Sequence, residues 1–143
     1  MQEVMADSAP EPVGPYPHAR QVGDFLLLSG MGPRIPGEQE IPGVTLNDQR
    51  QIVNYCIETQ TRQVFANLKA VLESAGAEWN DLVDITVFLT NMDDDFKTFN
   101  RVYAEYFTDN KPCRTTVEVN KLPTPIAVEL KCLAYKPKEK SNA

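Results

Sequence analysis

Histidine and cysteine, the side chains that most often build metal sites and disulfides, are scarce in this sequence. Its 143 residues include one histidine, His18, and three cysteines. A single histidine excludes the usual histidine-rich metal sites and makes a histidine-based catalytic triad depend on one residue. The cysteines (Cys56, Cys113 and Cys132) are odd in number and lack CxxC spacing. We therefore expect reduced thiols and no disulfide framework.

Long apolar runs and an excess of positive charge are missing as well. No stretch approaches the ~18 to 20 apolar residues of a membrane span, and the acidic, proline-rich start does not resemble a signal peptide. Fourteen Lys and Arg face twenty Asp and Glu, which gives a formal net charge of −6. This balance disfavours nucleic acids and anionic membranes as partners. We expect a cytoplasmic protein that binds neither.

Motifs for nucleotide binding and for a serine nucleophile are also missing. The chain has neither a GxxxxGK loop nor a GxGxxG turn, the glycine-rich segments that hold phosphates. Ser29 lies in LSGMG, which is not the GxSxG elbow, so we interpret it as part of a turn that exposes backbone groups. Cys113, beside Arg114, is either a reactive thiol or a small filler residue, and we favour the filler.

What is present is the composition of an ordinary globular domain. Hydrophobic residues make up 42% of the chain and charged residues 24%, and the length allows one domain with its own core. We expect a single domain over residues 1–143. Residues 1–12 and 137–143 are expected to be flexible tails.

Turn signals and apolar patterns predict the strands. Residues 19–33 have the pattern of a hairpin with its turn at Gly23-Asp24, and residues 41–56 contain two short strands about Asn47-Asp48. A further strand is predicted over residues 81–90. The last two strands are RTTVEVN (114–120) and IAVELKCLAY (126–135).

Two amphipathic helices are predicted between these strands. The first runs from about Glu58 to Ala75, where Gly76 supplies a stop. The acidic run Asp93-Asp94-Asp95 can cap the second helix. The apolar stripe of that helix is Phe96, Phe99, Tyr103, Tyr106 and Phe107.

This element order suggests an α+β domain in which two helices pack on one face of a mixed sheet. The strands nevertheless carry apolar side chains on both faces. Ile85, Val87 and Leu89 alternate with Phe88, and Leu26 and Leu28 alternate with Phe25 and Leu27. Because two helices cover only one face, we expect a homo-oligomer whose sheets pack together. The alternative is a set of exposed apolar residues without a partner.

Two charged residues stand out in the last two strands. In RTTVEVN, Arg114 shares a face with Thr116 and Glu118, and in IAVELKCLAY, Glu129 lies opposite its apolar neighbours. Charged residues on strand faces are often solvated pairs that contribute little to stability. From the pattern alone, this alternative stays open.

Several segments resemble those of the RidA (YjgF/UK114) family of enamine and imine deaminases. They are GPY (14–16), LSG (28–30), QTRQVFANLKAVLESAG (60–76), DLVDITVFLTNMDDDFKTFNRVYAEYF (81–107), PCRTTVEVNKLP (112–123) and AVELKCLA (127–134). Together they span nearly all of residues 12–136. The order Pro-x-Arg, Val-Glu-Val and Leu-Pro is the most specific part of this resemblance.

The resemblance implies a chorismate-mutase-like fold and a homotrimer. The trimer would be a barrel-like assembly with ligand clefts between its subunits, and two such trimers could also pair. It implies that Arg114 holds the carboxylate of a small substrate and that Glu129 activates water. The other cleft residues would be Tyr16, Ser29, Gly30 and Asn100, of which Asn100 has either a binding or a structural role. Water and proton transfers suffice for this chemistry, so no metal or organic cofactor is implied.

One departure and one narrower similarity bear on the substrate. Met31 stands where typical members have Gln, which removes a polar group from the cleft. Residues 17–30 and 112–132 are most similar to the 2-aminomuconate deaminase branch, which implies hydrolysis of a six-carbon enamine dicarboxylate to 4-oxalocrotonate in aromatic catabolism. A second carboxylate needs further polar groups, for which the candidates are His18, Arg20 and Arg34.

Other functions compete with this one. The enzyme, a hydrolase acting on C–N bonds, could instead be a general RidA-type deaminase for 2-aminoacrylate and related 2-imino acids. A non-catalytic trimer could bind a metabolite through the same arginine, although such a protein has less use for Glu129. Ribonuclease activity, described for the family, is disfavoured by the acidic charge and by the lack of an arginine–aromatic stripe.

Overall fold

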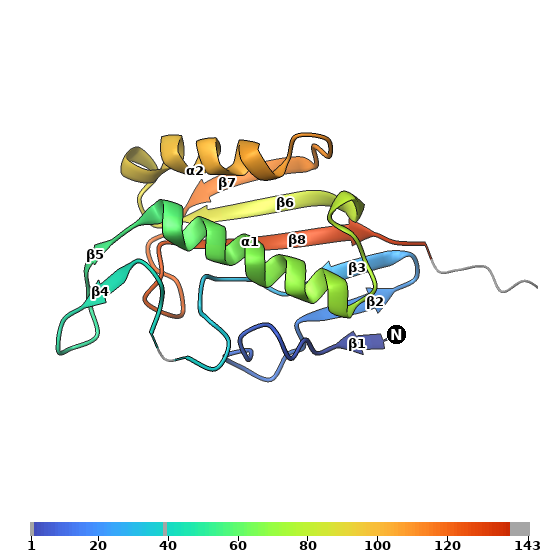
Figure 1. The fold of residues 1–143 in the computed structure, drawn as a ribbon, viewed down its shortest axis with the longest axis horizontal. Coiled ribbons are helices and arrows are strands. Elements are labelled where there is room, and N and C mark those ends of the chain that lie inside the picture. The colour runs from blue at the N-terminus through green and yellow to red at the C-terminus, as the bar shows by residue number, and fades with distance from the viewer. Residues whose placement is uncertain (1, 39, 138–143) are drawn as a thin grey trace, which may run out of the picture.

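A computed structural model describes residues 2–38 and 40–137 of the chain (Figure 1). The strands are β1 (Gln2–Val4), β2 (Ala19–Val22), β3 (Phe25–Leu28), β4 (Val44–Leu46), β5 (Ile52–Tyr55), β6 (Leu82–Leu89), β7 (Cys113–Glu118) and β8 (Val128–Tyr135). The helices are α1 (Ile57–Ser74) and α2 (Met92–Tyr106), and a short 3-10 helix, η1 (Trp79–Asp81), precedes β6.

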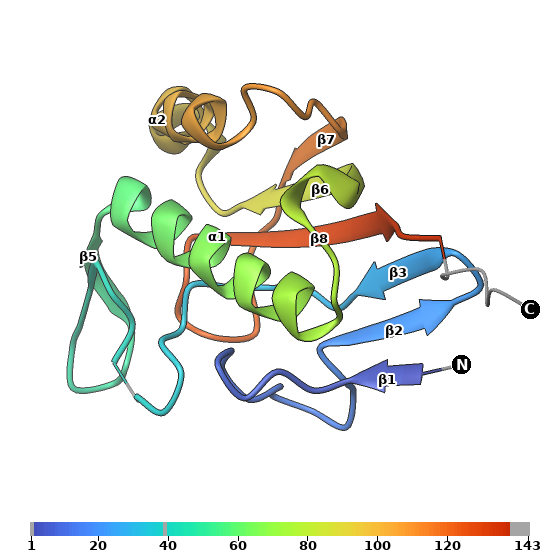
Figure 2. The same ribbon diagram turned by 45° about the vertical axis from the view of Figure 1, so that its right-hand side comes forward.

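Six of these strands form one mixed sheet, in the order β1-β2-β3-β8-β6-β7. Neighbouring strands are antiparallel except β6 and β7, which are parallel and connected through α2. Figures 1 and 2 show α1 and α2 on the same face of this sheet. The predicted α+β class, with two helices on one face of a mixed sheet, is confirmed. Along residues 2–38 and 40–137, neither helix has the length and apolarity needed to cross a bilayer.

The remaining strands, β4 and β5, form a separate antiparallel hairpin at one end of the molecule (Figure 1). Its turn is closed by Asn47, whose Oδ1 accepts hydrogen bonds from the backbone N–H groups of Gln49 and Gln51. Asn and Asp favour turns because their short side chains bond to the backbone two residues on. The turn predicted at Asn47-Asp48 is therefore present.

The hydrophobic core lies between the helices and the sheet. The strand residues Leu26, Leu28, Ile85, Val87 and Leu89 are at most 1% exposed, and so are the α1 residues Val64, Phe65, Leu68, Val71 and Leu72. Both sets repeat with the period of their element, two in the strands and 3.6 in the helix. The alternation predicted for these strands is confirmed.

The ends of the helices agree only partly with the sequence prediction. Gly76 follows α1 with a φ of 71°, which glycine adopts without the steric cost of a side chain. In α2, however, Asn91 is the N-cap, and its side chain accepts a hydrogen bond from the backbone N–H of Asp94. The acidic run occupies the first turn instead, where carboxylates interact favourably with the helix dipole. The apolar stripe predicted for this helix omitted Val102, which is fully buried in the structure, and included Phe96, which is 39% exposed.

The N-terminal segment is more ordered than predicted. Residues Gln2–Val4 pair with β2, with Val4 opposite Ala19, and both Val4 and Ala6 are buried. The expectation of a flexible tail over residues 1–12 is therefore wrong for this strand. Of the C-terminal tail predicted at 137–143, residues 138–143 lie outside the described residues.

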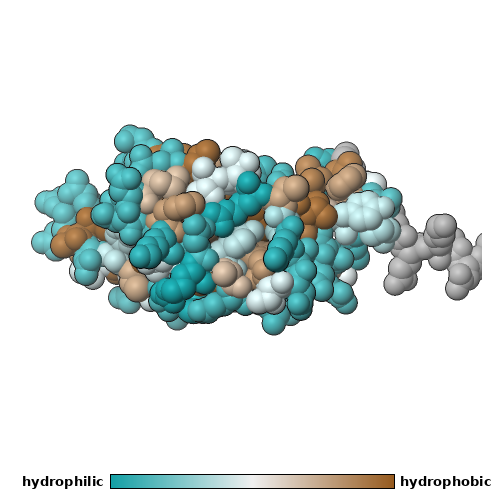
Figure 3. Space-filling model, turned by 90° about the horizontal axis from the view of Figure 1, so that it is seen from above, coloured by the Kyte–Doolittle hydropathy of each residue, from teal (hydrophilic) through white to brown (hydrophobic). Residues whose placement is uncertain are grey.

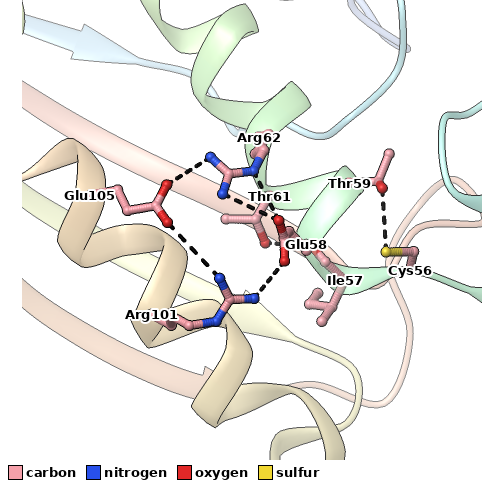
Figure 4. Close-up of polar contacts among 8 residues, drawn as sticks. All are labelled: Cys56, Ile57, Glu58, Thr59, Thr61, Arg62, Arg101 and Glu105. Carbon is pink, nitrogen blue, oxygen red and sulfur yellow. Dashed lines mark hydrogen bonds and ion pairs between the residues drawn. The ribbon is translucent and has the colours of Figure 1, made fainter.

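Four charged side chains join the outer surfaces of the two helices (Figure 4). Arg62 of α1 contacts Glu105 of α2 at 2.9 Å and Glu58 at 3.2 Å. Arg101 of α2 pairs with Glu58 and, at 3.9 Å, with Glu105. Arg101 and Arg62, in this order of effect, lower the pKa of Glu58. The four residues form a closed ring of ion pairs, to which each helix contributes one arginine and one glutamate.

The sheet face opposite the helices remains largely uncovered in one chain. Its exposed apolar side chains are Val22, Phe25, Leu27, Val117 and Tyr135, which are 37% to 44% exposed. Phe88 on the same face is only partly buried and packs against Ile41, Leu122 and Ile126. The predicted presence of apolar residues on both faces is confirmed.

Candidate functional site

Arg114 lies in β7, the strand at the edge of the sheet, and its side chain turns toward α2. Its Nε donates a hydrogen bond to Oγ1 of Thr116 at 2.9 Å, and its Nη2 donates to Oδ1 of Asn100 at 2.6 Å. These two bonds fix the guanidinium group. Its remaining N–H groups have no acceptor among the described residues and can bind a ligand. Asn100 therefore positions the Arg114 side chain, whether or not Asn100 also contacts a ligand.

Three aromatic rings of α2 surround this guanidinium. Its Cζ lies 4.6 Å from the ring centroid of Tyr103, 5.4 Å from that of Phe99 and 5.8 Å from that of Phe96. Aromatic faces attract cations and compensate part of their lost hydration. Seen from above, where α2 and β7 lie, the surface is mainly hydrophilic with separate hydrophobic patches (Figure 3).

Arg114 has no carboxylate within ion-pair distance in the described part of the chain. Burial lowers its pKa, and the nearby Tyr103 opposes this effect. A half-buried arginine with free donors and no anion is well suited to bind a carboxylate, because the planar guanidinium matches the two carboxylate oxygens.

Glu129 lies in β8, on the uncovered face of the sheet, in register with Phe88. Its carboxyl group is partly buried and has no hydrogen-bond partner among the described residues, and desolvation raises its pKa. A Cβ atom added to Gly30 would lie 2.8 Å from Glu129 Oε2, so the glycine leaves room for the carboxyl group. A carboxyl group with a raised pKa can take up and release protons closer to neutral pH.

Two further candidates, Ser29 and Gly30, follow β3 directly, and a third, Tyr16, precedes β2. Ser29 donates its hydroxyl hydrogen bond to the carbonyl of Pro17 at 2.7 Å, as a turn residue would. Ser29 and Gly30 border a small pocket together with Tyr16, whose side chain is 41% exposed. Gly30 thus lies both at this pocket and beside the Glu129 carboxyl group, and it links Tyr16 and Ser29 to that side of the candidate site.

His18 does not have the role expected of it. It is buried, its Nδ1 accepts a hydrogen bond from the backbone N–H of Ala6 at 2.9 Å, and its Nε2 lies 2.6 Å from the carbonyl of Pro10. Because Nδ1 accepts, Nε2 carries the proton and donates it to Pro10. This arrangement contradicts the prediction that His18 binds substrate, since neither ring nitrogen is free to do so.

The other two candidates for a second carboxylate differ in position, because Arg34 borders the pocket lined by Tyr16, Ser29 and Gly30 and Arg20 does not. Arg34 donates from Nη2 to the carbonyl of Glu11 at 2.6 Å, and Arg20 is an exposed residue of β2 opposite Glu3. Met31 is 5% exposed and packs in the core. It also borders the pocket lined by Tyr16, Ser29 and Gly30, and the expectation that it removes a polar group from the cleft stays a prediction.

Within one chain, Arg114 and Glu129 lie on opposite faces of the sheet. Arg114 is in register with Ile85, which faces the helices, and Glu129 is in register with Phe88, which faces away from them. Register partners on adjacent strands point to the same side. The shared cavity between subunits, predicted from the sequence, therefore requires a second copy and stays a prediction.

The aromatic surroundings of Arg114 were not predicted from the sequence. Phe96, Phe99 and Tyr103 were assigned only to the packing stripe of the second helix. The signal that could have found them is their own spacing, because Phe96, Phe99 and Tyr103 follow one another at intervals of three and four residues and therefore lie on one helical face. That face contacts the edge strand that carries Arg114.

The structure defines an α+β domain in which Arg114 is suited to bind a carboxylate and Glu129 is suited to transfer protons. Comparisons with known proteins place this domain in a family. The sequence model of the family described as Endoribonuclease L-PSP matches residues 6–136. A RutC family protein from Pyrococcus horikoshii is 43% identical over 137 residues, which cover 95% of this chain and 99% of the relative.

Two further relatives bear on the site. Reactive Intermediate Deaminase A, chloroplastic, from Arabidopsis thaliana is 33% identical over 131 residues, or 92% of this chain and 64% of the relative. The crystal structure of E. coli TdcF with bound serine has a TM-score of 0.81 and 29% identity, and the match covers 95% of this chain and 99% of TdcF. The chain belongs to the RidA/YjgF family, which includes RutC proteins and reactive intermediate deaminases.

Proposed function

We propose that this protein is a deaminase that hydrolyses a small 2-imino acid, or the enamine that tautomerises to it, to a 2-oxo acid and ammonia. The observation that carries the proposal is Arg114, a half-buried cation with free donors and no anionic partner among the described residues. Support comes from the similarity to a reactive intermediate deaminase. TdcF, which binds serine, is a relative whose ligand also carries a carboxylate.

The proposed chemistry needs a positioned carboxylate, one water and a proton carrier. Arg114 binds the substrate carboxylate, which places the imine carbon. Glu129 accepts a proton as water adds to the C=N carbon, and it returns a proton to nitrogen. The resulting amino alcohol loses ammonia and leaves the C=O group, so one imine and one water become one ketone and one ammonia. Proton transfer by a carboxyl group with a raised pKa is general acid–base catalysis.

We propose further that a second copy completes this site in a homotrimer. Arg114 and Glu129 lie on opposite faces of one sheet, so an arginine from one copy must meet a glutamate from another. The exposed apolar residues of the uncovered face, such as Leu27 and Phe25, would then be buried between copies.

The test of the activity is ammonia release from 2-aminoacrylate formed in situ, beside 2-aminomuconate. Arg114→Ala should raise KM strongly and slow turnover, and Arg114→Lys should recover only part of the loss, because lysine lacks the planar fork. Lys97→Ala, which alters an exposed α2 residue, is the matched control. Undiminished turnover by Arg114→Ala would refute the proposal.

The test of the shared site is complementation between two inactive variants. Arg114→Ala and Glu129→Gln chains are unfolded together in equal amounts and refolded. If each site takes Arg114 from one copy and Glu129 from the next, about a quarter of the sites regain both residues by random assembly in a cyclic oligomer. Activity no greater than the sum of the two separate variants contradicts a site shared between copies.

The substrate within this class is a narrower question. The 2-aminomuconate prediction required a second cation or a cluster of amides. Of the candidates that border the Tyr16 pocket, His18 has both ring nitrogens bonded to backbone groups and Arg34 has donors left over. The serine ligand of TdcF carries one carboxylate. We therefore place small monocarboxylates first and keep the dicarboxylate as the second arm of the activity test. Faster turnover of 2-aminomuconate would reverse that order.

A trimer that binds a metabolite without converting it remains the second candidate, and one observation favours it: the serine ligand of TdcF. Binding of serine with no ammonia release from either imine would support it. Salt-dependent binding of single-stranded RNA tests the ribonuclease alternative suggested by the family description.

A further inference from the structure

A second cavity lies between the β4–β5 hairpin and the loop that connects β7 to β8. Its volume is about 420 Å³, which falls in the range of sites for small organic molecules. Figures 1 and 2 show the hairpin and the loop at the same end of the sheet. Neither Arg114 nor Glu129 lines this cavity.

The described lining of this cavity is positively charged in an acidic protein. It includes Arg50 from the hairpin and Lys121 from the loop, and no Asp or Glu. Neither cation has an ion-pair partner within residues 2–38 and 40–137. The chain as a whole has twenty acidic residues, so two unpaired cations at one cavity favour an anion there.

Arg50 also has an unusual backbone conformation. Its φ is 59°, and it is the one residue other than glycine with a positive φ among those that the structure describes. A side chain at such a φ costs energy that glycine avoids. Strained residues of this kind tend to occur at functional positions. At this turn the arginine therefore costs stability but places its charged group at the cavity.

The floor of the cavity is apolar. Leu122 and Ile126 are 8% and 3% exposed and border it together with Ile52. A ligand that matches both parts of the lining has an anionic head, which pairs with the two cations, and an apolar body, which covers this floor.

We propose that this cavity binds a small organic anion, with its carboxylate or phosphate head at Arg50 and Lys121 and its apolar body on Leu122 and Ile126. The site is distinct from the one at Arg114 and does not depend on the proposed deaminase activity. Its ligand would be an effector or a second small metabolite.

The experiment is titration of the whole protein with 3-phenylpropionate, phenyl phosphate and the neutral 3-phenylpropionamide, followed by NMR of isoleucine methyl groups. We expect shifts at Ile52 and Ile126 with the two anions and at least about tenfold weaker binding of the amide, since hydrogen bonds to charged groups are the stronger ones. The anion that binds more tightly identifies the head group. Equal binding of the amide overturns the proposal.

Arg50→Gly provides the decisive variant, because it removes the guanidinium group and relieves the backbone. We expect anion binding to weaken about tenfold while the thermal midpoint rises, so a folding defect cannot explain the loss. Lys97→Ala and Arg114→Ala should leave the shifts at Ile52 and Ile126 unchanged. Unaltered affinity in Arg50→Gly, shifts that disappear with Arg114→Ala, or a cavity closed to all three probes would each overturn the proposal.

Discussion

Replacing Gly30 by alanine tests whether the position of the Glu129 carboxyl group sets the rate. The added Cβ would lie 2.8 Å from Oε2 and 3.0 Å from Cδ of Glu129. Ordinary van der Waals contact begins near 3.4 Å, so the carboxyl group must retreat by about 0.6 Å. Gly30 has no positive φ, so alanine fits its backbone.

The expected effect is large on catalysis and small on stability. A displacement of ~1 Å in a reacting group costs on the order of a hundredfold in rate, so kcat should fall roughly ten- to a hundredfold. The carboxyl group is the mobile end of its side chain, and alanine reduces the entropy of the unfolded chain. The free energy of unfolding should therefore change by less than about 1 kcal/mol.

Ammonia release gives kcat and KM, and thermal unfolding gives stability. Gly32→Ala is the matched control, because its Cβ would meet Cδ1 of Ile126 at 2.9 Å and not Glu129. This control should lower stability and leave kcat within about twofold.

A double-mutant cycle decides the mechanism of the effect. If Gly30→Ala acts through Glu129, it should add little to the loss already caused by Glu129→Gln. Full additivity, or a normal kcat in Gly30→Ala, would refute the reasoning that the glycine exists to make room for the carboxyl group.

Four further predictions concern stability, pH and assembly. Because burial raises the pKa of Glu129, its ionised form destabilises the fold above that pKa. Glu129→Gln should therefore be more stable than the parent at pH 7, and the gain in stability should vanish below the unfolded pKa of about 4.3. A gain that stays constant across this pH range in denaturant melts would contradict the prediction. Glu58 has a lowered pKa, so its stabilising effect is present above its pKa in the unfolded chain and is lost as the pH falls through its pKa in the folded protein. The loss of Tm caused by Glu58→Gln should therefore shrink on acidification and in high salt. A loss of Tm that does not depend on salt would exclude the ring of Glu58, Arg62, Arg101 and Glu105 as its cause. Tyr103 has a buried hydroxyl with no hydrogen-bond partner among the described residues, so Tyr103→Phe should stabilise the protein by about 1 kcal/mol with KM unchanged. Tyr103→Leu should raise KM, because it removes the ring under Arg114; equal KM values in the two variants would exclude the ring as a positioning group. If the uncovered face forms the proposed homotrimer, Leu27→Lys should give monomers in light scattering and abolish activity. An unchanged oligomer would show that this face is not the interface.

The sequence predicted the elements that depend on local chemistry and periodicity. Val64, Phe65 and Leu68 repeat with helical spacing, and Gly76 ends that helix with the positive φ that glycine favours. Alternation in β6 correctly separated Ile85 and Val87 from Phe88. Such patterns arise from contacts within one element, so they can be recognised without the rest of the fold.

Elements that depend on distant partners could not be predicted in this way. The strand Gln2–Val4 has only three residues and exists because it pairs with β2. His18 looked like a ligand-binding residue, but its ring nitrogens bond to Ala6 and Pro10, which no local pattern reveals. The N-cap of α2 is Asn91 and not the acidic run, because the cap depends on which side chain meets the first free N–H groups.

The relation between Arg114 and Glu129 belongs to the same category. Alternation assigned each residue to a face of its own strand. Whether the two faces coincide depends on the registers of β7 and β8 against β6. Those registers are set by long-range pairing, so the sequence alone did not place the two residues on opposite faces of one sheet.

The separation of these two charges within one chain has a chemical consequence. At the α1–α2 surface, where arginine and glutamate do touch, Arg101 and Arg62 lower the pKa of Glu58. A direct contact between Arg114 and Glu129 would do the same to Glu129 and would occupy the donors that a substrate carboxylate needs. On opposite faces of the sheet, Glu129 keeps its raised pKa and Arg114 keeps its free donors. In a site completed by a second copy, the substrate would come between the two charges and keep them apart, so that each enters the reaction in its reactive state.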